Sequence, residues 1–198
     1  MSEKTKRGES IINIASEIFQ KYGFKKTTID DIAEAAHKGK SSLYYYFKSK
    51  EEIFKAVIEK EAKIIKSILT EIVNDPKLEA EDKFRKYVAV RMEQFKERVN
   101  YYDALNNDYL SHYRFINKIR EQHDKEEQQL IRKILDEGVK KNKFDIPDIN
   151  IAAYAIIIAM KGLEIPIFIT KEIDNPEEKI NHLLNILFNG ILKNNKNK

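Results

Sequence analysis

The feature that most restricts the fold of this chain is the stretch 41–47, which reads Ser-Ser-Leu-Tyr-Tyr-Tyr-Phe. A helix turns neighbouring side chains to different faces, so three successive tyrosines cannot all enter one core. Some of these rings must point outward, next to two hydroxyls and between Lys40 and Lys48. Phenols, hydroxyls and lysines suit a surface that contacts phosphates and base edges. The stretch is therefore predicted to be a short helix that recognises DNA.

The whole chain is predicted to be all-α. Its 198 residues include only 6 glycines and 4 prolines, so turn signals are sparse. Apolar residues recur instead at helical spacing. The first apolar stripe comprises Ile11, Ile14, Ala15, Ile18, Phe19 and Tyr22. It predicts a helix that ends at Gly23, a typical C-terminal glycine.

A second short helix is predicted to open at Thr28. The Thr28 side chain can cap the first amide groups, and Asp31 occupies the capping-box position three residues later. Ile32 and the pair Ala35-Ala36 are predicted to form its buried side. A turn at residues 37–40 then leads into the tyrosine helix. Two short helices joined by such a turn make a helix-turn-helix.

The remaining sequence predicts a second, larger helical part. Ser49 and Glu52 form another capping box, which opens a long helix that ends near Val73 before Asn74-Asp75-Pro76. Further helices are predicted near residues 84–99, 116–141, 149–168 and 177–193. The fold as a whole is expected to have about nine helices. The helix at 149–168 is apolar on nearly every side and is predicted to be buried all round.

Composition excludes several classes of protein. The chain has no cysteine, which rules out disulfides, thiolate metal sites and cysteine nucleophiles. The first residues have no apolar region typical of a signal peptide, and the longest uncharged apolar run, 151–160, is too short to cross a bilayer. We therefore expect a cytoplasmic protein without membrane contact.

No pattern typical of an enzyme occurs. The four histidines, His37, His112, His123 and His182, show no metal-ligand spacing, and no phosphate-binding glycine loop is present. The carboxylate pair Glu126-Glu127 is better explained as a solvated face. We expect no catalytic residue, no metal site and no cofactor.

The positive charge of the chain lies at its N-terminal end. Residues 1–50 contain ten Lys or Arg and six Asp or Glu, a net charge of +4 that equals the net charge of the whole chain. This bias is expected of a small domain that binds nucleic acid, although clustered surface lysines alone would also produce it.

Residues 10–55 resemble the DNA-binding domain of the TetR-type (TetR/AcrR) transcriptional regulators. The matching residues are Ile14-Ala15, Phe19, Gly23-Phe24, Thr27-Thr28-Ile29-Asp30-Asp31-Ile32-Ala33 and Leu43-Tyr44-Tyr45-Tyr46-Phe47-Lys48-Ser49-Lys50-Glu51-Glu52-Ile53. The resemblance implies a helix-turn-helix DNA-binding domain at residues 1–50 and a helical effector-binding and dimerisation domain at residues 51–198.

The turn departs from the family pattern. After Ala36 the family usually has Gly, a small aliphatic residue, Ser, Lys and Gly, whereas this chain has His37-Lys38-Gly39-Lys40-Ser41. His37 takes a position that often needs a positive φ, which His tolerates better than most residues. Lys38 replaces a buried aliphatic residue, and Gly39 replaces the hydroxyl cap of the recognition helix.

By this resemblance the tyrosine helix enters the major groove of double-stranded operator DNA. Lys40, Ser41, Ser42 and Tyr45 would reach base edges or adjacent phosphates. Tyr44, Lys50 and Thr28 would contact the DNA backbone, Thr28 together with the start of the second helix. Leu43, Tyr46 and Phe47 are expected to anchor the helix to its own domain.

One such domain reads only a few base pairs, so a homodimer is expected. The apolar helices near 149–168 and 177–193 would form its interface, and a two-fold dimer implies a palindromic operator. Alternatively these helices bury only the core of their own domain.

An aromatic cluster at residues 101–115 allows two interpretations. It can line a cavity for a small apolar or aromatic effector, with lining residues Tyr102, Leu105, Asp108, Tyr109, His112 and Tyr113. It can equally be packed core. The first interpretation predicts a repressor that its effector releases from DNA; the second favours a regulator controlled by a protein partner or by no effector.

Overall fold

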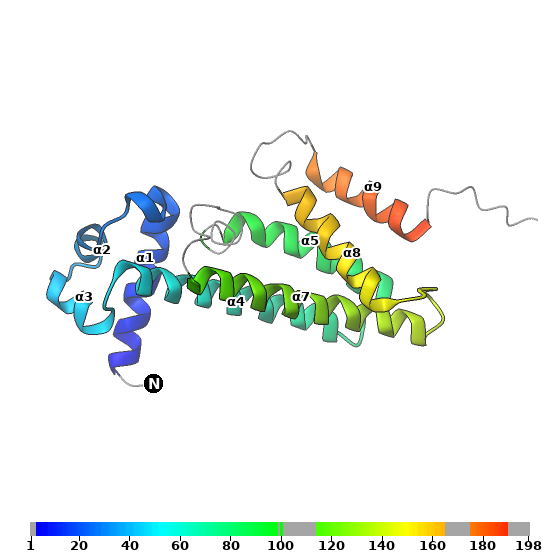
Figure 1. The fold of residues 1–198 in the computed structure, drawn as a ribbon, viewed down its shortest axis with the longest axis horizontal. Helices are drawn as coiled ribbons and strands as arrows, with labels where there is room; N and C mark the ends of the chain where they lie inside the picture. Colours follow the sequence, from blue (N-terminus) through cyan, green and yellow to red (C-terminus); the bar gives the residue numbers. More distant parts are fainter. Residues whose placement is uncertain (1–2, 99, 101–113, 165–174, 190–198) are drawn as a thin grey trace, which may run out of the picture. The chain divides into compact units, whose positions relative to one another are not determined.

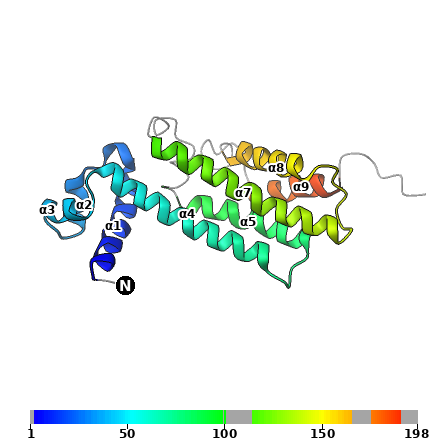
Figure 2. The same cartoon turned by 60° about the horizontal axis from the view of Figure 1, so that its bottom comes forward.

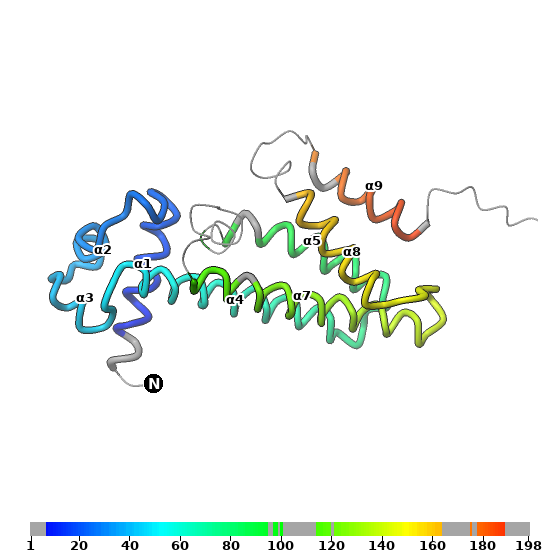
Figure 3. The backbone as a smooth tube through the Cα atoms, viewed as in Figure 1, coloured from blue at the N-terminus to red at the C-terminus, as the bar shows by residue number. Residues whose placement is uncertain are grey.

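A computed structural model describes residues 3–98, 100, 114–164 and 175–189. These ranges contain eight helices and no strand, which confirms the all-α prediction, and Figure 1 shows how the helices follow one another. They are α1 (Glu3–Lys26), α2 (Ile29–Ala35), α3 (Lys40–Tyr46), α4 (Lys50–Asn74), α5 (Ala80–Glu97), α7 (Arg114–Lys140), α8 (Ile149–Glu164) and α9 (Pro176–Asn189). The tube in Figure 3 follows the same path.

The chain forms two compact units, and the boundary between them passes through α4, α5 and α7. The first unit comprises Met1–Ile68 and Gln94–Glu126, and the second comprises Leu69–Glu93 and Glu127–Lys198. The first unit therefore contains all of α1, α2 and α3. The functional division at residue 50 stays a prediction.

Helix α1 is broken at Gly23, as the sequence predicted. This residue has φ +78° and ψ 157°, a backbone conformation outside the helical region that glycine adopts without steric cost. The Thr27 hydroxyl donates a hydrogen bond of 2.9 Å to the Gly23 carbonyl across the break. Ile11, Ala15 and Phe19 are buried, whereas Tyr22 at the end of the predicted stripe is 49% exposed.

Three phenylalanines build the core beneath this break. The ring of Phe24 lies 5.9 Å from that of Phe19 and 4.5 Å from that of Phe54 in α4, measured between centroids. Phe19 and Phe54 meet edge to face at 5.0 Å. This cluster joins the two ends of the break in α1 to the first turns of α4.

The second unit buries charged groups that the sequence placed in solvent. Glu127 is 2% exposed and forms an ion pair with Arg91, which is 1% exposed. The Tyr87 hydroxyl donates to the same carboxylate at 3.4 Å. The prediction of a solvated face is therefore wrong for Glu127, because the guanidinium of Arg91 supplies the charge that makes its burial tolerable.

Helix α7 ends in a Schellman motif. Asn142 adopts φ +53°, the Lys143 amide donates to the Gly138 carbonyl at 2.8 Å, and the Asn142 amide donates to the Val139 carbonyl at 3.0 Å. The chain then turns so that the ring of Phe144 lies 5.9 Å from that of Phe188 in α9.

Helix α8 is buried on only one face within a single chain, so the prediction of burial all round stays a prediction that needs a second copy. Asp148 caps the helix by accepting from the amides of Asn150 and Ile151, at 2.8 and 3.1 Å. One face is buried through Ala153, Ile157 and Met160, because only that face packs on its own unit. The other face exposes Ile151 (67%), Tyr154 (60%) and Ile158 (50%).

Helix α9 has a similar exposed apolar face. Ile180 and Leu184 are buried, while Leu183, Ile186 and Leu187 are between 43% and 53% exposed. Among the described residues, none of the helices has the length and apolar character needed to cross a membrane.

Candidate nucleic-acid interface

Helix α2 begins with the capping box that the sequence predicted. The Thr28 hydroxyl accepts from the Asp31 amide at 3.2 Å and donates to the Asp31 carboxylate at 2.8 Å. The Thr28 amide donates to the same carboxylate at 2.7 Å. These bonds, first from the hydroxyl and then from the amide, lower the pKa of Asp31, and the positive charge of Lys50 adds to the effect. The predicted DNA contact Thr28 is thus already bonded within the protein.

The turn between α2 and α3 depends on His37. Its φ of +50° lies in the left-handed region, as the sequence predicted for this position. The Lys38 amide donates to the Ala33 carbonyl at 3.0 Å and closes the turn. Ile32 is buried as predicted, but the buried alanine beside it is Ala33, whereas the predicted Ala35 and Ala36 are only half-buried.

Helix α3 has two distinct sides. Leu43 is fully buried, and Tyr46 and Phe47 are half-buried. Tyr45 is 67% exposed and Tyr44 is 47% exposed. The helix starts at Gly39 without any side-chain cap, as expected from the missing hydroxyl. Figures 1 and 2 both show α3 next to α2.

The remaining predicted contacts of α3 differ in their exposure. Ser41 is exposed and Ser42 is half-buried. The Lys40 ammonium lies 2.9 Å from the Asp30 carboxylate, and both side chains are exposed. The hydrogen bond and the charge of Asp30 raise the pKa of Lys40. Lys40 therefore stays protonated but shares its charge with an acid of α2.

Lys50 is placed in a way that the sequence did not indicate. Its ammonium donates to the carbonyls of Phe24 and Thr27, at 2.9 and 2.8 Å. It also lies 4.5 Å from the centroid of the Phe24 ring. These partners lie more than twenty positions earlier in the chain, so no local spacing reveals them.

The start of α4 carries a modified capping box. The Ser49 hydroxyl accepts from the Glu52 amide at 3.3 Å, as the sequence predicted. The Glu52 carboxylate accepts instead from the Lys48 amide, at 2.6 Å, one residue before the cap. The connection between α3 and α4 is thereby fixed by both side chains.

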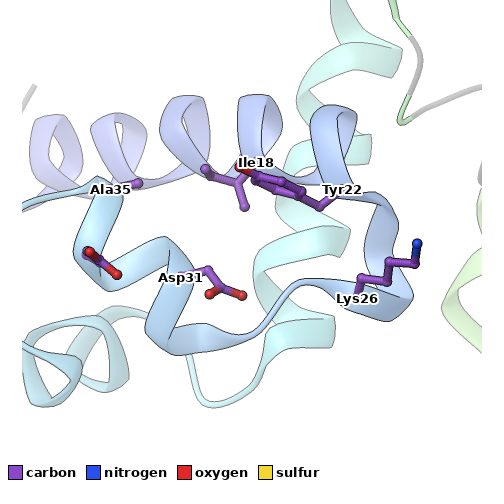
Figure 4. A pocket seen from close by; sticks show the side chains of 6 residues that line it. Ile18, Tyr22, Lys26, Asp31 and Ala35 are labelled. Carbon is purple, nitrogen blue, oxygen red and sulfur yellow. The ribbon is translucent and has the colours of Figure 1, made fainter.

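A shallow groove between α1 and α2 was not expected from the sequence. Figure 4 shows its lining side chains, which are Ile18, Tyr22, Lys26, Asp31, Glu34 and Ala35. The predicted effector residues, Tyr102, Leu105, Asp108, Tyr109, His112 and Tyr113, lie outside the described residues. Within the described ranges no three His, Asp or Glu side chains gather in a way that could hold a metal ion.

Comparisons with known proteins give consistent results. Residues 11–57 match the sequence model of the bacterial regulatory proteins of the tetR family. The HTH-type transcriptional regulator QacR of Staphylococcus aureus is 26% identical over 194 residues, which cover 93% of this chain and 98% of that protein.

Solved structures share the fold. A transcriptional regulator from Cytophaga hutchinsonii superimposes with a TM-score of 0.76 at 26% identity, covering 91% of this chain and 96% of that one. The regulator FadR of Bacillus subtilis, solved in complex with stearoyl-CoA, has a TM-score of 0.76 at 18% identity, covering 93% and 99%.

Proposed function

Because residues 11–57 match the model of the tetR family of bacterial regulatory proteins and QacR is similar over 93% of the chain, we propose that this protein is a repressor of that family that binds a palindromic operator through α3. The observation that carries the proposal is the division of α3 into two sides. Leu43 fixes the helix in the core while Tyr44 and Tyr45 stand in solvent. A helix held in this way can place its outer side chains in the major groove.

The proposed contacts divide into two kinds. Tyr45, Ser41 and Ser42 contact base edges or the phosphates beside them, together with Lys40. Tyr44 and Thr28 contact the DNA backbone, and the family resemblance adds Lys50, whose ammonium already bonds two protein carbonyls. Phosphate contacts set the affinity for any DNA, whereas base contacts set the choice of sequence. Since Lys40 pairs with Asp30 and Thr28 bonds Asp31, DNA phosphates compete with these bonds.

We further propose a homodimer through the exposed faces of α8 and α9. Six apolar side chains stand at least 43% exposed on these two helices: Ile151, Tyr154, Ile158, Leu183, Ile186 and Leu187. A second copy that covers them would remove this apolar surface from water and provide two recognition helices for two half-sites. Sedimentation as a monomer at micromolar concentration would contradict this pairing.

An effector that releases the DNA is the last part of the proposal. Its support is the aromatic cluster of the sequence at residues 101–115, which suits a small apolar or aromatic molecule. The FadR structure contains stearoyl-CoA, but at 18% identity that likeness concerns the fold alone. Titration of the operator complex with apolar and aromatic compounds tests this part. Release by none of them, together with release by a protein fraction, would favour control by a partner.

The test of the DNA-binding proposal uses Tyr45. After the operator is located by footprinting the DNA beside the gene, Tyr45→Ala is expected to lower the ratio of operator binding to random-DNA binding by about 5- to 150-fold, the effect of losing one base contact worth about 1–3 kcal/mol. Tyr45→Phe, which keeps the ring, is the matched control and should lose less. Equal losses on operator and random DNA would contradict the assignment of Tyr45 to base recognition.

A further inference from the structure

Lys50 is the first residue of α4, and its side chain turns back toward the end of α1. The ammonium group has three N–H donors, and two of them are used by the carbonyls of Phe24 and Thr27 at 2.9 and 2.8 Å. The Lys50 side chain is half-buried, and its ammonium lies 4.5 Å from the centroid of the Phe24 ring, which is itself 4% exposed. This is the geometry of a structural contact within the protein.

The two carbonyls belong to the connection between α1 and α2. Gly23 breaks α1 just before Phe24, and Thr27 is the last residue before the cap of α2. Carbonyl groups at the end of a helix lack helical partners and carry negative partial charge, so a lysine ammonium suits them. Lys50 thereby holds both ends of a four-residue segment from a single point on α4.

The start of α2 depends on this segment. The Thr27 carbonyl that Lys50 binds belongs to the peptide bond whose amide, that of Thr28, donates to Asp31 in the capping box. Helix α2 packs in turn on α1 and α3. A displacement of this peptide would therefore move the cap, then α2, and then the recognition helix.

We propose that Lys50 is a positioning residue for operator binding: it sets the placement of α2 and α3 from α4 rather than acting mainly as a phosphate contact. This inference rests on the proposed DNA-binding function. It predicts that Lys50 contributes to operator recognition through protein geometry that exists before DNA arrives.

The two roles differ in salt dependence. A lysine that neutralises one phosphate contributes about 0.9 to the slope of log K against log salt concentration. Lys50→Met keeps the apolar stem and removes the charge and the donors. We expect operator affinity to fall at least about 10-fold, and the operator-to-random ratio to fall with it, while the slope changes by much less than about 0.9. Lys50→Arg, which restores charge and donors, should recover most of the affinity.

A second measurement uses the full chain without DNA. Hydrogen exchange of the backbone amides at residues 24–31 should accelerate in Lys50→Met and stay near wild type in Lys50→Arg. Lys48→Met is the matched control, because it removes the same charge from an exposed side chain two residues earlier. It should leave exchange at residues 24–31 unchanged.

The outcomes separate the alternatives. A slope reduced by about 0.9, equal losses on operator and random DNA, and unchanged exchange would overturn the proposal in favour of a phosphate contact. If the wild-type protein bound no operator, the proposed function would fail, while the exchange measurement would still decide whether Lys50 holds the connection. Loss of folding in Lys50→Met with native exchange and affinity in Lys50→Arg would support the positioning role.

Discussion

At the scale of single residues, the polar groups of the first unit bond one another. The Thr28 hydroxyl bonds Asp31, Lys40 pairs with Asp30, and Lys50 holds two carbonyls. Such bonds orient the side chains before DNA arrives, which lowers the entropic cost of ordering them at the interface. If these side chains contact DNA as proposed, a phosphate has to replace their existing partners.

Some of these features could be predicted from local spacing and others could not. The capping box of Thr28 and the positive φ of His37 follow from residues within four positions of one another. The contacts of Lys50 join residues 23 and 26 positions apart, so only the folded chain brings them together.

The capping box gives a pH dependence. The pKa of Asp31 is lowered in the folded chain by the Thr28 hydrogen bonds, so the box contributes stability above the ordinary pKa of about 3.8. That contribution is lost as the pH falls through the lowered pKa. We expect Asp31→Asn to reduce the melting temperature at pH 7 and to flatten its decline below about pH 4. If the melting temperature of the variant declined with pH in parallel with that of the wild type, the assignment would be contradicted.

At the scale of helices, boundaries follow from caps and stop signals. Thr28 and Ser49 begin α2 and α4 as predicted, Asp148 caps α8, and α4 ends at Asn74. The start of α1 at Glu3 was missed, because this part of the helix precedes the apolar stripe. The burial of Arg91 and Glu127 was missed because each charge is tolerated only through its partner on another helix.

Replacing Gly138 in α7 with alanine is expected to destabilise the protein, which is the opposite of the usual effect of this substitution in a helix. Replacing a helical glycine with alanine normally stabilises by about 0.5–1 kcal/mol. A Cβ at Gly138, however, would overlap the ring of Phe144, with the ring Cγ at 2.7 Å. The Phe144 ring packs beside Phe188, so a ring displaced by the new Cβ would lose this packing contact. We expect Gly138→Ala to destabilise by about 1–3 kcal/mol, as overpacking does.

The matched control is Gly162 in α8, where a Cβ would meet nothing within 4 Å. Gly162→Ala should therefore stabilise by about 0.5–1 kcal/mol. Urea denaturation midpoints of both variants give the measurement. An increase in stability for Gly138→Ala as large as that for Gly162→Ala would refute the contact with Phe144.

At the scale of the whole molecule, the resemblance to the tetR family could be recognised from the sequence because the motif of residues 11–57 is local and specific. The all-α class followed from helical periodicity. The sequence predicted a dimer interface on α8 but left burial in its own domain as an alternative, because hydropathy does not tell whether the neighbour of an apolar face is the same chain or another copy. The exposed face of Ile151, Tyr154 and Ile158 supports the proposal of a second copy.

The most direct test of the proposed function is selection of bound duplexes from a pool of random DNA by the full-length protein. Two copies that each present one α3 predict enrichment of an inverted repeat, with its half-sites about one helical turn or a multiple of it apart. The Tyr45→Ala variant should enrich the same repeat less strongly. A bound pool with no enriched sequence, or with a single unpaired half-site, would contradict a dimeric repressor that reads a palindromic operator.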